Sequence, residues 1–395
     1  MTSVGLFTYS TKPRGSVVHA TYLAEALTAR GHDVTLYALS KAGDLLYREL
    51  ACPVVYLEAE KAPAHPDSLI AQRVREVARG IARLRPRHDV YHAEDCLAAS
   101  GLLASRGELG GAPLVRTLHH LEHFDSAYLQ DCQRRSIVEA SAVACVSKLS
   151  QRDVARAFGR QCPIIGNGVD VARFAKNPSL ERACRARFSI GPSDVVVLSV
   201  GGVEPRKNTL RTLEAMIPVL LRNPQARWLI AGGASIWEHD AYRGAFFTRL
   251  AELSANLRSR MVVLGSVTEQ ELSGLYGVSQ ILLCPSLQEG FGLCVLEAMA
   301  AQNALVVADA APFTEYLPRD AACFVDPASE SSIGAAVERL LQDERLRSAL
   351  AAEGAVRAPR FSWDRVAVEH EELYRGLLAA TRRQPASAYE ERAHA

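Results

Sequence analysis

The sequence predicts an α/β fold of two doubly wound domains, and the order of its apolar segments and its length carry that prediction. Short apolar runs alternate with amphipathic helical segments over residues 4–170, and the same alternation begins again at residue 195. This βαβ order is typical of mainly parallel sheets. A chain of 395 residues also exceeds what one hydrophobic core usually serves. We therefore expect two Rossmann-like domains, at residues 1–172 and 193–362, with a cleft between them.

The first domain begins with a strand at residues 4–9, followed by a loop at residues 12–16. A helix is expected over residues 19–30, because Gly31 ends its apolar pattern, and a second strand over residues 32–39. This strand, loop, helix and strand form the first βαβ unit of the chain.

The second domain follows a polar stretch at residues 175–194, and we expect a hinge near residues 171–194. Five apolar runs predict its strands, at residues 195–200, 228–231, 261–264, 281–283 and 304–307. Open parallel sheets bind ligands beyond the carboxyl ends of their strands, so the interdomain cleft is the expected site.

Composition excludes several classes of function. The formal net charge is +1, which gives no electrostatic case for nucleic acid as a partner. The nine cysteines show neither C-x-x-C nor metal-ligand spacing, which indicates reduced thiols. No apolar run approaches the length of a membrane span, and residues 1–7 lead into a strand rather than a signal peptide. We expect a cytoplasmic protein.

The segment at residues 285–299 is the most informative part of the chain. Its two carboxylates, Glu289 and Glu297, flank Gly290 and Gly292 where a strand passes into a helix. Glycine lets the backbone approach a ligand, and the unpaired N–H groups of a helix start favour negative charge. The alternative is purely structural, because glutamate is a good helix former and such junctions occur in many α/β domains.

The same segment resembles the E-x7-E signature of the retaining glycosyltransferases of family 4, which have the two-domain GT-B fold. The resemblance implies that Glu289 lies beside hydroxyls of the donor sugar and that Glu297 holds the ribose of the nucleotide. It also assigns substrate binding to the junction residues Gly290, Phe291, Gly292 and Leu293. The likeness extends over nearly the whole chain and is most specific at residues 195–330.

A second motif, at residues 200–208, contains the adjacent cations Arg206 and Lys207 between a strand and a helix. Such cations suit a diphosphate whose charge grows as the sugar leaves, and the alternative is a solvated basic turn. The loop resembles the phosphate loop of the family, which usually reads V-G-R with a later Lys. Lys207 matches that Lys, whereas Gly202 stands in place of the usual Arg. We assign the missing charge to Arg206.

Two weaker matches complete the expected donor site. Gly15 and Ser16 lie in a segment that resembles the glycine-rich loop facing the phosphates, although a plain turn is the alternative. Val267 lies where related enzymes contact the nucleobase through the backbone.

The segment at residues 116–123 has three interpretations. His119, Glu122 and His123 fit H-x-x-E-H, an inverted zinc-peptidase spacing that requires a helix. Alternatively, residues 113–118 form a strand and His119 lies at its carboxyl end, where the family has a histidine near the donor sugar. His120 takes that place if the register shifts by one residue, and surface histidines are the third interpretation. We favour His119 as a catalytic residue.

Helix-like spacing of apolar residues at 70–84, accompanied by arginines at 73–87, favours a core-facing stripe with solvated arginines. Weak contact with a membrane surface is the alternative. A helix at about residues 363–382 resembles the C-terminal crossover that returns to the first domain of the family.

Taken with the resemblance, these patterns predict a retaining hexosyltransferase. It would move a sugar from a nucleoside-diphosphate sugar to an unidentified small-molecule, glycan or lipid acceptor. No D-x-D pair is present to hold a metal against the diphosphate, so neither a metal nor another cofactor is expected. Two alternatives remain open, a nucleotide-sugar epimerase of the same fold and a non-catalytic nucleotide-sugar-binding protein.

Overall fold

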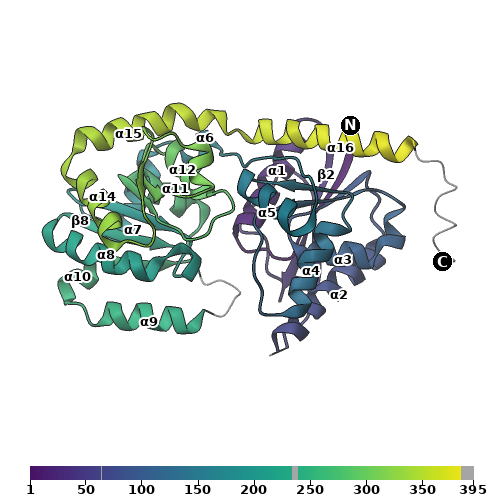
Figure 1. Cartoon of the computed structure of the whole chain (residues 1–395), viewed down its shortest axis with the longest axis horizontal. Helices are drawn as coiled ribbons and strands as arrows, with labels where there is room; N and C mark the ends of the chain where they lie inside the picture. Colours follow the sequence, from purple (N-terminus) through teal and green to yellow (C-terminus); the bar gives the residue numbers. More distant parts are fainter. Residues whose placement is uncertain (64, 234–238, 384–395) are drawn as a thin grey trace. The chain divides into compact units, whose positions relative to one another are not determined.

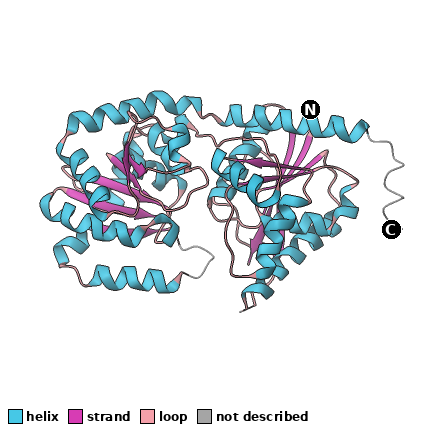
Figure 2. Cartoon of the chain, in the orientation of Figure 1, coloured by secondary structure: helices cyan, strands magenta, loops and turns pink. Residues whose placement is uncertain are grey.

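The computed structural model describes residues 1–63, 65–233 and 239–383, which form two compact units (Figure 1). Unit 1 contains Met1–Asn167 and the C-terminal segment from Trp363, and unit 2 contains Gly168–Ser362. Within the described residues, each unit has one six-stranded sheet. Helices cover these sheets (Figure 2).

The sheet of unit 1 is parallel, with the strand order β3-β2-β1-β4-β5-β6. Its strands are β1 (Ser3–Thr8), β2 (Asp33–Lys41), β3 (Val54–Ala59), β4 (Val90–Ala93), β5 (Leu114–Leu118) and β6 (Ala142–Cys145). Because β1 lies between β2 and β4, the direction of winding reverses between β1 and β4. Ligands of open α/β sheets bind at such a switch point.

The helices of unit 1 include one from the far end of the chain. They are α1 (Gly15–Ala29), α2 (Pro66–Leu84), α3 (Cys96–Ala104), η1 (Arg106–Leu109), α4 (Ala127–Val138), α5 (Lys148–Phe158) and α16 (Trp363–Arg383). Helix α16 lies along α1 (Figure 1). Trp363 stacks on Tyr22 with ring centroids 5.2 Å apart, and Arg30 pairs with Asp364 at 2.8 Å and with Glu371 at 2.5 Å.

Helix α1 begins four residues before the predicted start at residue 19. Arg14 is the extended N-cap residue, and the amide of Val18 donates to its carbonyl oxygen at 2.8 Å, which closes the first turn. No side chain caps this end. The usual Ser, Thr or Asp signal for a helix start is therefore missing from the sequence, which explains the error.

The sheet of unit 2 is also parallel and has the order β12-β11-β10-β7-β8-β9. Its strands are β7 (Val195–Val200), β8 (Ala226–Ala231), β9 (Met261–Gly265), β10 (Ile281–Cys284), β11 (Ala304–Ala308) and β12 (Cys323–Val325). The first strand, β7, again lies between the second strand and a later one. The switch point of unit 2 is therefore between β7 and β10.

Helices of unit 2 occupy most of the connections between its strands. They are α6 (Val171–Phe174), α7 (Pro178–Arg187), η2 (Pro205–Lys207), α8 (Thr209–Arg222), α9 (Asp240–Ala251), α10 (Ala255–Arg260), α11 (Glu269–Val278), α12 (Leu293–Ala300), α13 (Phe313–Tyr316), α14 (Glu330–Gln342), α15 (Glu344–Arg357) and η3 (Ala358–Arg360). The polar stretch interpreted as a hinge thus contains α7, which packs on α11. An added Cβ on Gly274 would lie 2.9 Å from the carbonyl oxygen of Leu180, so glycine permits this close approach.

Both cores are built from the apolar runs that predicted the strands. Val196, Val197 and Leu198 in β7 are fully buried, as are Ile281 and Leu282 in β10. Strands of parallel sheets are covered on both faces, which is why they appear in the sequence as continuous rather than alternating apolar runs.

The arginine-rich helix α2 turns its apolar stripe inward. Ile70, Val74, Val77 and Ile81 are all buried, whereas Leu84, at the last turn of the stripe, is exposed. The expectation that its arginines are solvated is wrong for Arg73, which is buried and pairs with Glu76 at 2.6 Å. Among the described residues, no helix combines the length and apolar character needed to cross a bilayer.

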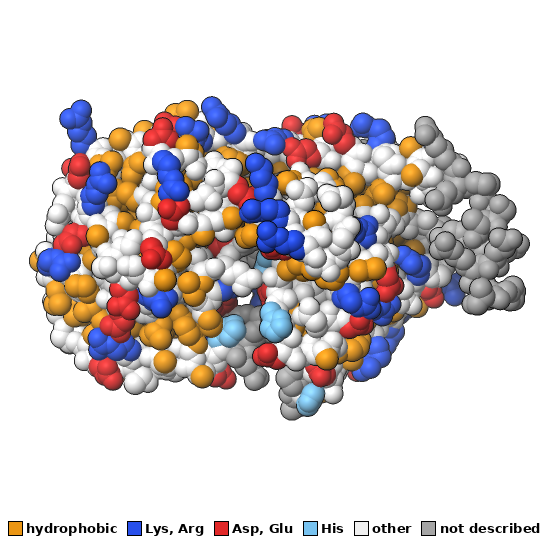
Figure 3. Space-filling view, viewed as in Figure 1, with side chains coloured by type: hydrophobic (Ala, Val, Ile, Leu, Met, Phe, Trp, Pro, Cys, Tyr) orange, Lys and Arg blue, Asp and Glu red, His pale blue; other side chains and the backbone are white. Residues whose placement is uncertain are grey.

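Acidic and basic side chains are interspersed over the face of the molecule shown in Figure 3. This mixture agrees with the formal net charge of +1.

Candidate active site

The strongest constellation lies at the switch point of unit 2, where the loops after β7 and β10 meet. The amides of Leu287 and Gln288 donate to the carbonyl oxygen of Arg206 at 2.8 and 3.3 Å. Asn208, in the left-handed conformation, donates through its side chain to the carbonyl oxygens of Pro285 and Pro327 at 3.1 and 2.6 Å. These bonds hold the two predicted motifs against each other, although Lys207 and Glu289 are 82 residues apart in sequence.

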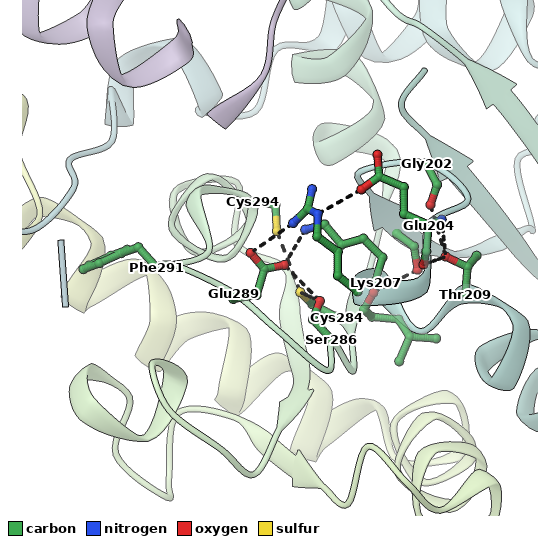
Figure 4. A network of polar contacts seen from close by, with 12 residues as sticks. Gly202, Glu204, Lys207, Thr209, Cys284, Ser286, Glu289, Phe291 and Cys294 are labelled. Carbon is green, nitrogen blue, oxygen red and sulfur yellow. Dashed lines mark hydrogen bonds and ion pairs between the residues drawn. The ribbon is translucent and has the colours of Figure 1, made fainter. Parts of the chain in front are cut away.

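Lys207 and Glu289 form an ion pair at the centre of this site (Figure 4). Ser286 donates to the same carboxylate at 2.9 Å, and Nη1 of Arg206 lies 3.8 Å from its Oε2. Burial alone would raise the pKa of Glu289, but Lys207 and Arg206 outweigh it and lower that pKa. Burial likewise opposes the charge on Lys207, yet Glu289 raises its pKa. Both groups are therefore charged, and they neutralise each other.

Arg206 stands between two carboxylates. Its Nε lies 2.9 Å from Oε2 of Glu204, and its side chain is 38% exposed, compared with 12% for Lys207. Arg206 is thus the more accessible of the two cations and can turn toward an anion that enters from solvent.

Gly202 explains why this chain lacks the usual arginine of the phosphate loop. Its φ is +76°, and an added Cβ would lie 2.7 Å from the carbonyl oxygen of Gly233 and 3.0 Å from that of Gly232. The amide of Gly202 also donates to Ala231 at 3.0 Å, which holds the backbone against β8. No side chain fits at this position without moving the loop.

The glycine junction opens α12 as the sequence predicts. Gly292 is the N-cap residue with φ +94°, and an added Cβ would lie 2.6 Å from the ring of Phe313. No side chain caps this end of the helix. The backbone of Gly290, Phe291 and Leu293 therefore lies around a helix start whose amides favour an anion.

Glu297 lies on the inner face of α12 and is nearly fully buried. The hydroxyl of Tyr276 donates to its Oε2 at 2.7 Å. Burial raises the pKa of Glu297 to about 7 despite that bond. The carboxyl group thus changes charge near neutral pH.

Val267 is half-buried in the loop between β9 and α11. Its neighbour Thr268 begins α11 through a capping box with Glu271. Among the described residues, no hydrogen bond joins Val267 to the Lys207–Glu289 pair, so its role stays a prediction. Gly15 and Ser16 are in the first turn of α1 in unit 1, rather than in a loop.

His119 directly follows β5, as the favoured interpretation expects. Its Nε2 lies 3.1 Å from Oε2 of Glu94, the residue after β4. Residues 119–126 are not helical, and His120 contacts Glu122. The zinc-peptidase interpretation of H-x-x-E-H is therefore wrong.

The sequence analysis missed Glu94 and His19. Nδ1 of His19, on α1, lies 3.0 Å from Oε2 of Glu94, and both side chains are fully buried. The ligand atoms of His19, Glu94 and His119 lie within 4.8 Å of one another, close enough for a metal. Glu94 is hydrogen-bonded to His119, whereas Nδ1 of His19 lies close to the same oxygen without forming a hydrogen bond. The position of Glu94 at a strand end was the available signal.

Two family models match the chain. "Glycosyltransferase Family 4" matches residues 13–173, and "Glycosyl transferases group 1" matches residues 182–357. The chain belongs to glycosyltransferase family 4. The family prediction from the E-x7-E segment is therefore confirmed.

Relatives of this glycosyltransferase align along most of its length. The phosphatidyl-myo-inositol mannosyltransferase of Mycolicibacterium smegmatis is 27% identical over 93% of this chain and 92% of its own. The D-inositol 3-phosphate glycosyltransferase of Acidothermus cellulolyticus is 27% identical over 93% and 87%.

Among solved structures, sucrose-phosphate synthase from Thermosynechococcus elongatus superposes with a TM-score of 0.78. It has 21% identity and covers 96% of this chain and 100% of its own. Anabaena HepE, in complex with UDP and glucose, gives 0.77 with 20% identity over 95% and 100%. The predicted α/β GT-B fold is confirmed, and the protein is a glycosyltransferase that acts on nucleotide sugars.

Proposed function

We propose that this glycosyltransferase moves a hexose from a nucleoside-diphosphate sugar to an acceptor hydroxyl with retention of anomeric configuration and without a metal. The observation that carries the proposal is the Lys207–Glu289 ion pair beside the start of α12. Fixed cations and amides aimed at developing negative charge stabilise a departing diphosphate.

Lys207 and Arg206 receive the diphosphate in this proposal. A bound diphosphate would share Lys207 with Glu289 and draw Arg206 away from Glu204. The amides around Gly290, Phe291, Gly292 and Leu293 add partial positive charge from the helix. These groups replace the divalent cation that other transferases use.

Glu289 accepts hydrogen bonds from donor-sugar hydroxyls, and Glu297 accepts them from the ribose. Tyr276 holds one oxygen of Glu297 at 2.7 Å, which leaves its other oxygen for the ribose. Val267 contacts the base through its backbone.

In the transfer step, the bond between the anomeric carbon and the diphosphate oxygen breaks, and the acceptor oxygen bonds to that carbon. The acceptor proton passes to an oxygen of the diphosphate, so atoms and charge balance. Attack from the face of the leaving group retains configuration, and no covalent enzyme intermediate is required.

The domain roles follow the same proposal. Residues 193–362 hold the nucleotide sugar. Residues 1–172, with the helix at 363–382, supply the acceptor side, and contribute His119 beside the donor sugar and Gly15 and Ser16 toward the phosphates. The cytoplasmic location also remains part of the proposal.

The named relatives guide the choice of substrates. HepE structures contain UDP, glucose or UDP-glucose, and two curated relatives act on inositol-containing acceptors according to their names. UDP-sugars are therefore the first donors to test. The acceptor remains a hydroxyl of a small molecule, glycan or lipid.

Calorimetric titration of the full chain with UDP-, GDP- and ADP-sugars in EDTA tests the proposal. We expect one nucleotide class to bind, with binding lost in Lys207→Ala and Glu297→Ala. Arg249→Ala, which removes a surface pair with Glu214, is the matched control and should bind normally. Binding that requires a metal, or that survives both substitutions, contradicts the assignment.

Turnover separates the remaining alternatives. Isomerisation of the donor sugar without acceptor indicates an epimerase, and tight donor binding without turnover over an acceptor panel indicates a binding protein. Once product is obtained, its anomeric proton coupling reports retention or inversion directly.

A further inference from the structure

Three side chains from separate elements meet at the switch point of unit 1. His19 comes from α1, Glu94 follows β4, and His119 follows β5. A single carboxylate oxygen, Oε2 of Glu94, lies 3.0 Å from Nδ1 of His19 and 3.1 Å from Nε2 of His119. Glu94 and His19 are fully buried, whereas the His119 side chain is 16% exposed. His119 is therefore the member of the group that a ligand can reach.

The chemistry of these groups fixes where the protons are. An ionised carboxylate can only accept hydrogen bonds, so Nε2 of His119 must carry a proton toward Glu94. In a neutral imidazole the other nitrogen, Nδ1, then holds a lone pair. Nδ1 of His119 has no hydrogen-bond partner among the described residues and is not among the buried unpaired atoms. The lone pair is therefore open to solvent.

Helix α16 and β4 close the other sides of the group. The ring centroids of Trp363 and His370 lie 5.4 and 6.0 Å from that of His19. Nε2 of His92 lies 3.8 Å from Oε1 of Glu94 and is itself held by Thr117 at 2.7 Å. Because of this packing, a ligand cannot contact the carboxylate of Glu94 directly.

We propose that Glu94 is a positioning residue that fixes His119 in the tautomer with a free Nδ1, and that this nitrogen accepts a hydrogen bond from a substrate hydroxyl. The ligand class is thus a neutral hydroxyl of the sugar or the acceptor, rather than a phosphate. The inference rests on the proposed transferase function, but its site lies wholly in unit 1.

The tautomer can be read directly by NMR of the full chain labelled with ¹⁵N-histidine. We expect His119, assigned by its loss in His119→Gln, to show a protonated Nε2 and an unprotonated Nδ1. In Glu94→Gln the amide can donate as well as accept, so the ratio of the two His119 tautomers should shift toward the one with a protonated Nδ1. A wild-type His119 with protonated Nδ1 overturns the proposal.

Enzyme kinetics provide a second test of the proposal. We expect Glu94→Gln to lower kcat/KM by about 10- to 100-fold, the effect of losing one hydrogen bond to a charged group. The double variant with His119→Gln should be no worse than His119→Gln alone, because Glu94 acts through that ring. Additive losses overturn the proposal. Calorimetric binding of UDP, GDP or ADP should be unchanged in both variants, and its loss in wild type would instead count against the proposed function.

The titratable and charged groups around the Glu94–His119 pair are His19 on α1, His92 on β4, Arg116 on β5 and His370 on α16. Replacing any one of these four groups should leave the tautomer of His119 observed by NMR unchanged, whereas replacing Glu94 should change it. Titration with Zn²⁺ or Co²⁺ completes the test. One tightly bound ion that is lost in both Glu94→Gln and His119→Gln would make the group a metal site and overturn the proposal.

Discussion

Units 1 and 2 have the same winding but carry different chemistry at their switch points. In both sheets the first strand lies between the second strand and a later one. At the switch point of unit 2, Lys207 and Arg206 pair with Glu289 beside an uncapped helix start. At that of unit 1, one buried carboxylate, Glu94, is surrounded by imidazoles. The shared fold therefore determines where each site lies, and the side chains on the strand ends determine what each site can bind.

The difference matches the two halves of a glycosyl transfer. A diphosphate gains negative charge when the sugar leaves, and unit 2 offers Lys207 and Arg206. Sugar and acceptor hydroxyls are neutral, and burial lowers the pKa of His119 to about 4 although Glu94 opposes this. A neutral ring suits a hydroxyl and does not attract phosphate.

The largest expected effect on activity comes from removing the charge of Lys207 in unit 2. Lys207→Ala should lower kcat/KM by about 10³-fold, because a preorganised charge at the leaving group is lost. It also leaves Glu289 buried beside Arg206 alone. Initial rates of nucleoside-diphosphate release measure this effect, with Arg249→Ala as control. A loss below about 10-fold would mean that the charge asymmetry of the two units does not drive catalysis.

Replacing Gly202 with the arginine that is usual in the family should destabilise the protein rather than improve its activity. In Gly202→Arg, the added Cβ meets backbone oxygens at 2.7 and 3.0 Å with φ at +76°. We expect the free energy of unfolding to fall by about 2 kcal/mol or more. Urea unfolding measures this change. Gly244→Ala, at a helix position with nothing within 4 Å, should be neutral or slightly stabilising. A stable, more active Gly202→Arg would show that the phosphate loop is free to move.

Glu297 should make the stability of unit 2 depend on pH. Its pKa is raised from 4.5 to about 7 by burial, so the native state retains a proton that the unfolded state releases. Stability from this group is therefore lost as pH rises from about 4.5 to about 7. Relative to wild type, Glu297→Gln should gain about 1–3 kcal/mol between pH 4.5 and 8. Urea unfolding at both pH values measures this, and the exposed Glu330→Gln should show no such gain.

The smallest expected effect is a loss of stability from a substitution in unit 1. The hydroxyl of Tyr374 on α16 is 2.6 Å from Nδ1 of His92. Tyr374→Phe removes this buried hydrogen bond and should lower the free energy of unfolding by about 1 kcal/mol. Calorimetry should find donor binding unchanged. Weakened donor binding would show that packing in unit 1 controls the site in unit 2.

The sequence predicted the site of unit 2 better than that of unit 1, for a physical reason. Lys207 and Glu289 each lie in a local strand-to-helix motif, and local spacing is visible in the chain. Gly202 was recognised as a departure from the family pattern, but the carbonyl oxygens that forbid a side chain there belong to Gly232 and Gly233, directly after β8, which only the fold brings near.

Unit 1 is assembled from residues distant in sequence. His19, Glu94 and His119 share no motif, and only the parallel alignment of β4 with β5 and the course of α1 bring them together. The H-x-x-E-H spacing pointed to Glu122 and His123, because neighbours in sequence stand out where neighbours in space do not. Likewise, the start of α1 lacks a capping residue, which hid its first turn.

Hydrogen exchange measured by mass spectrometry, with and without UDP, GDP and ADP in EDTA, tests the division between the units most directly. This division predicts that one nucleotide protects the amides of residues 201–208 and 286–296 in unit 2. Protection in these segments should be absent in Lys207→Ala and retained in Glu94→Gln. Protection that appears only with a divalent cation, or only around His119 in unit 1, would contradict it.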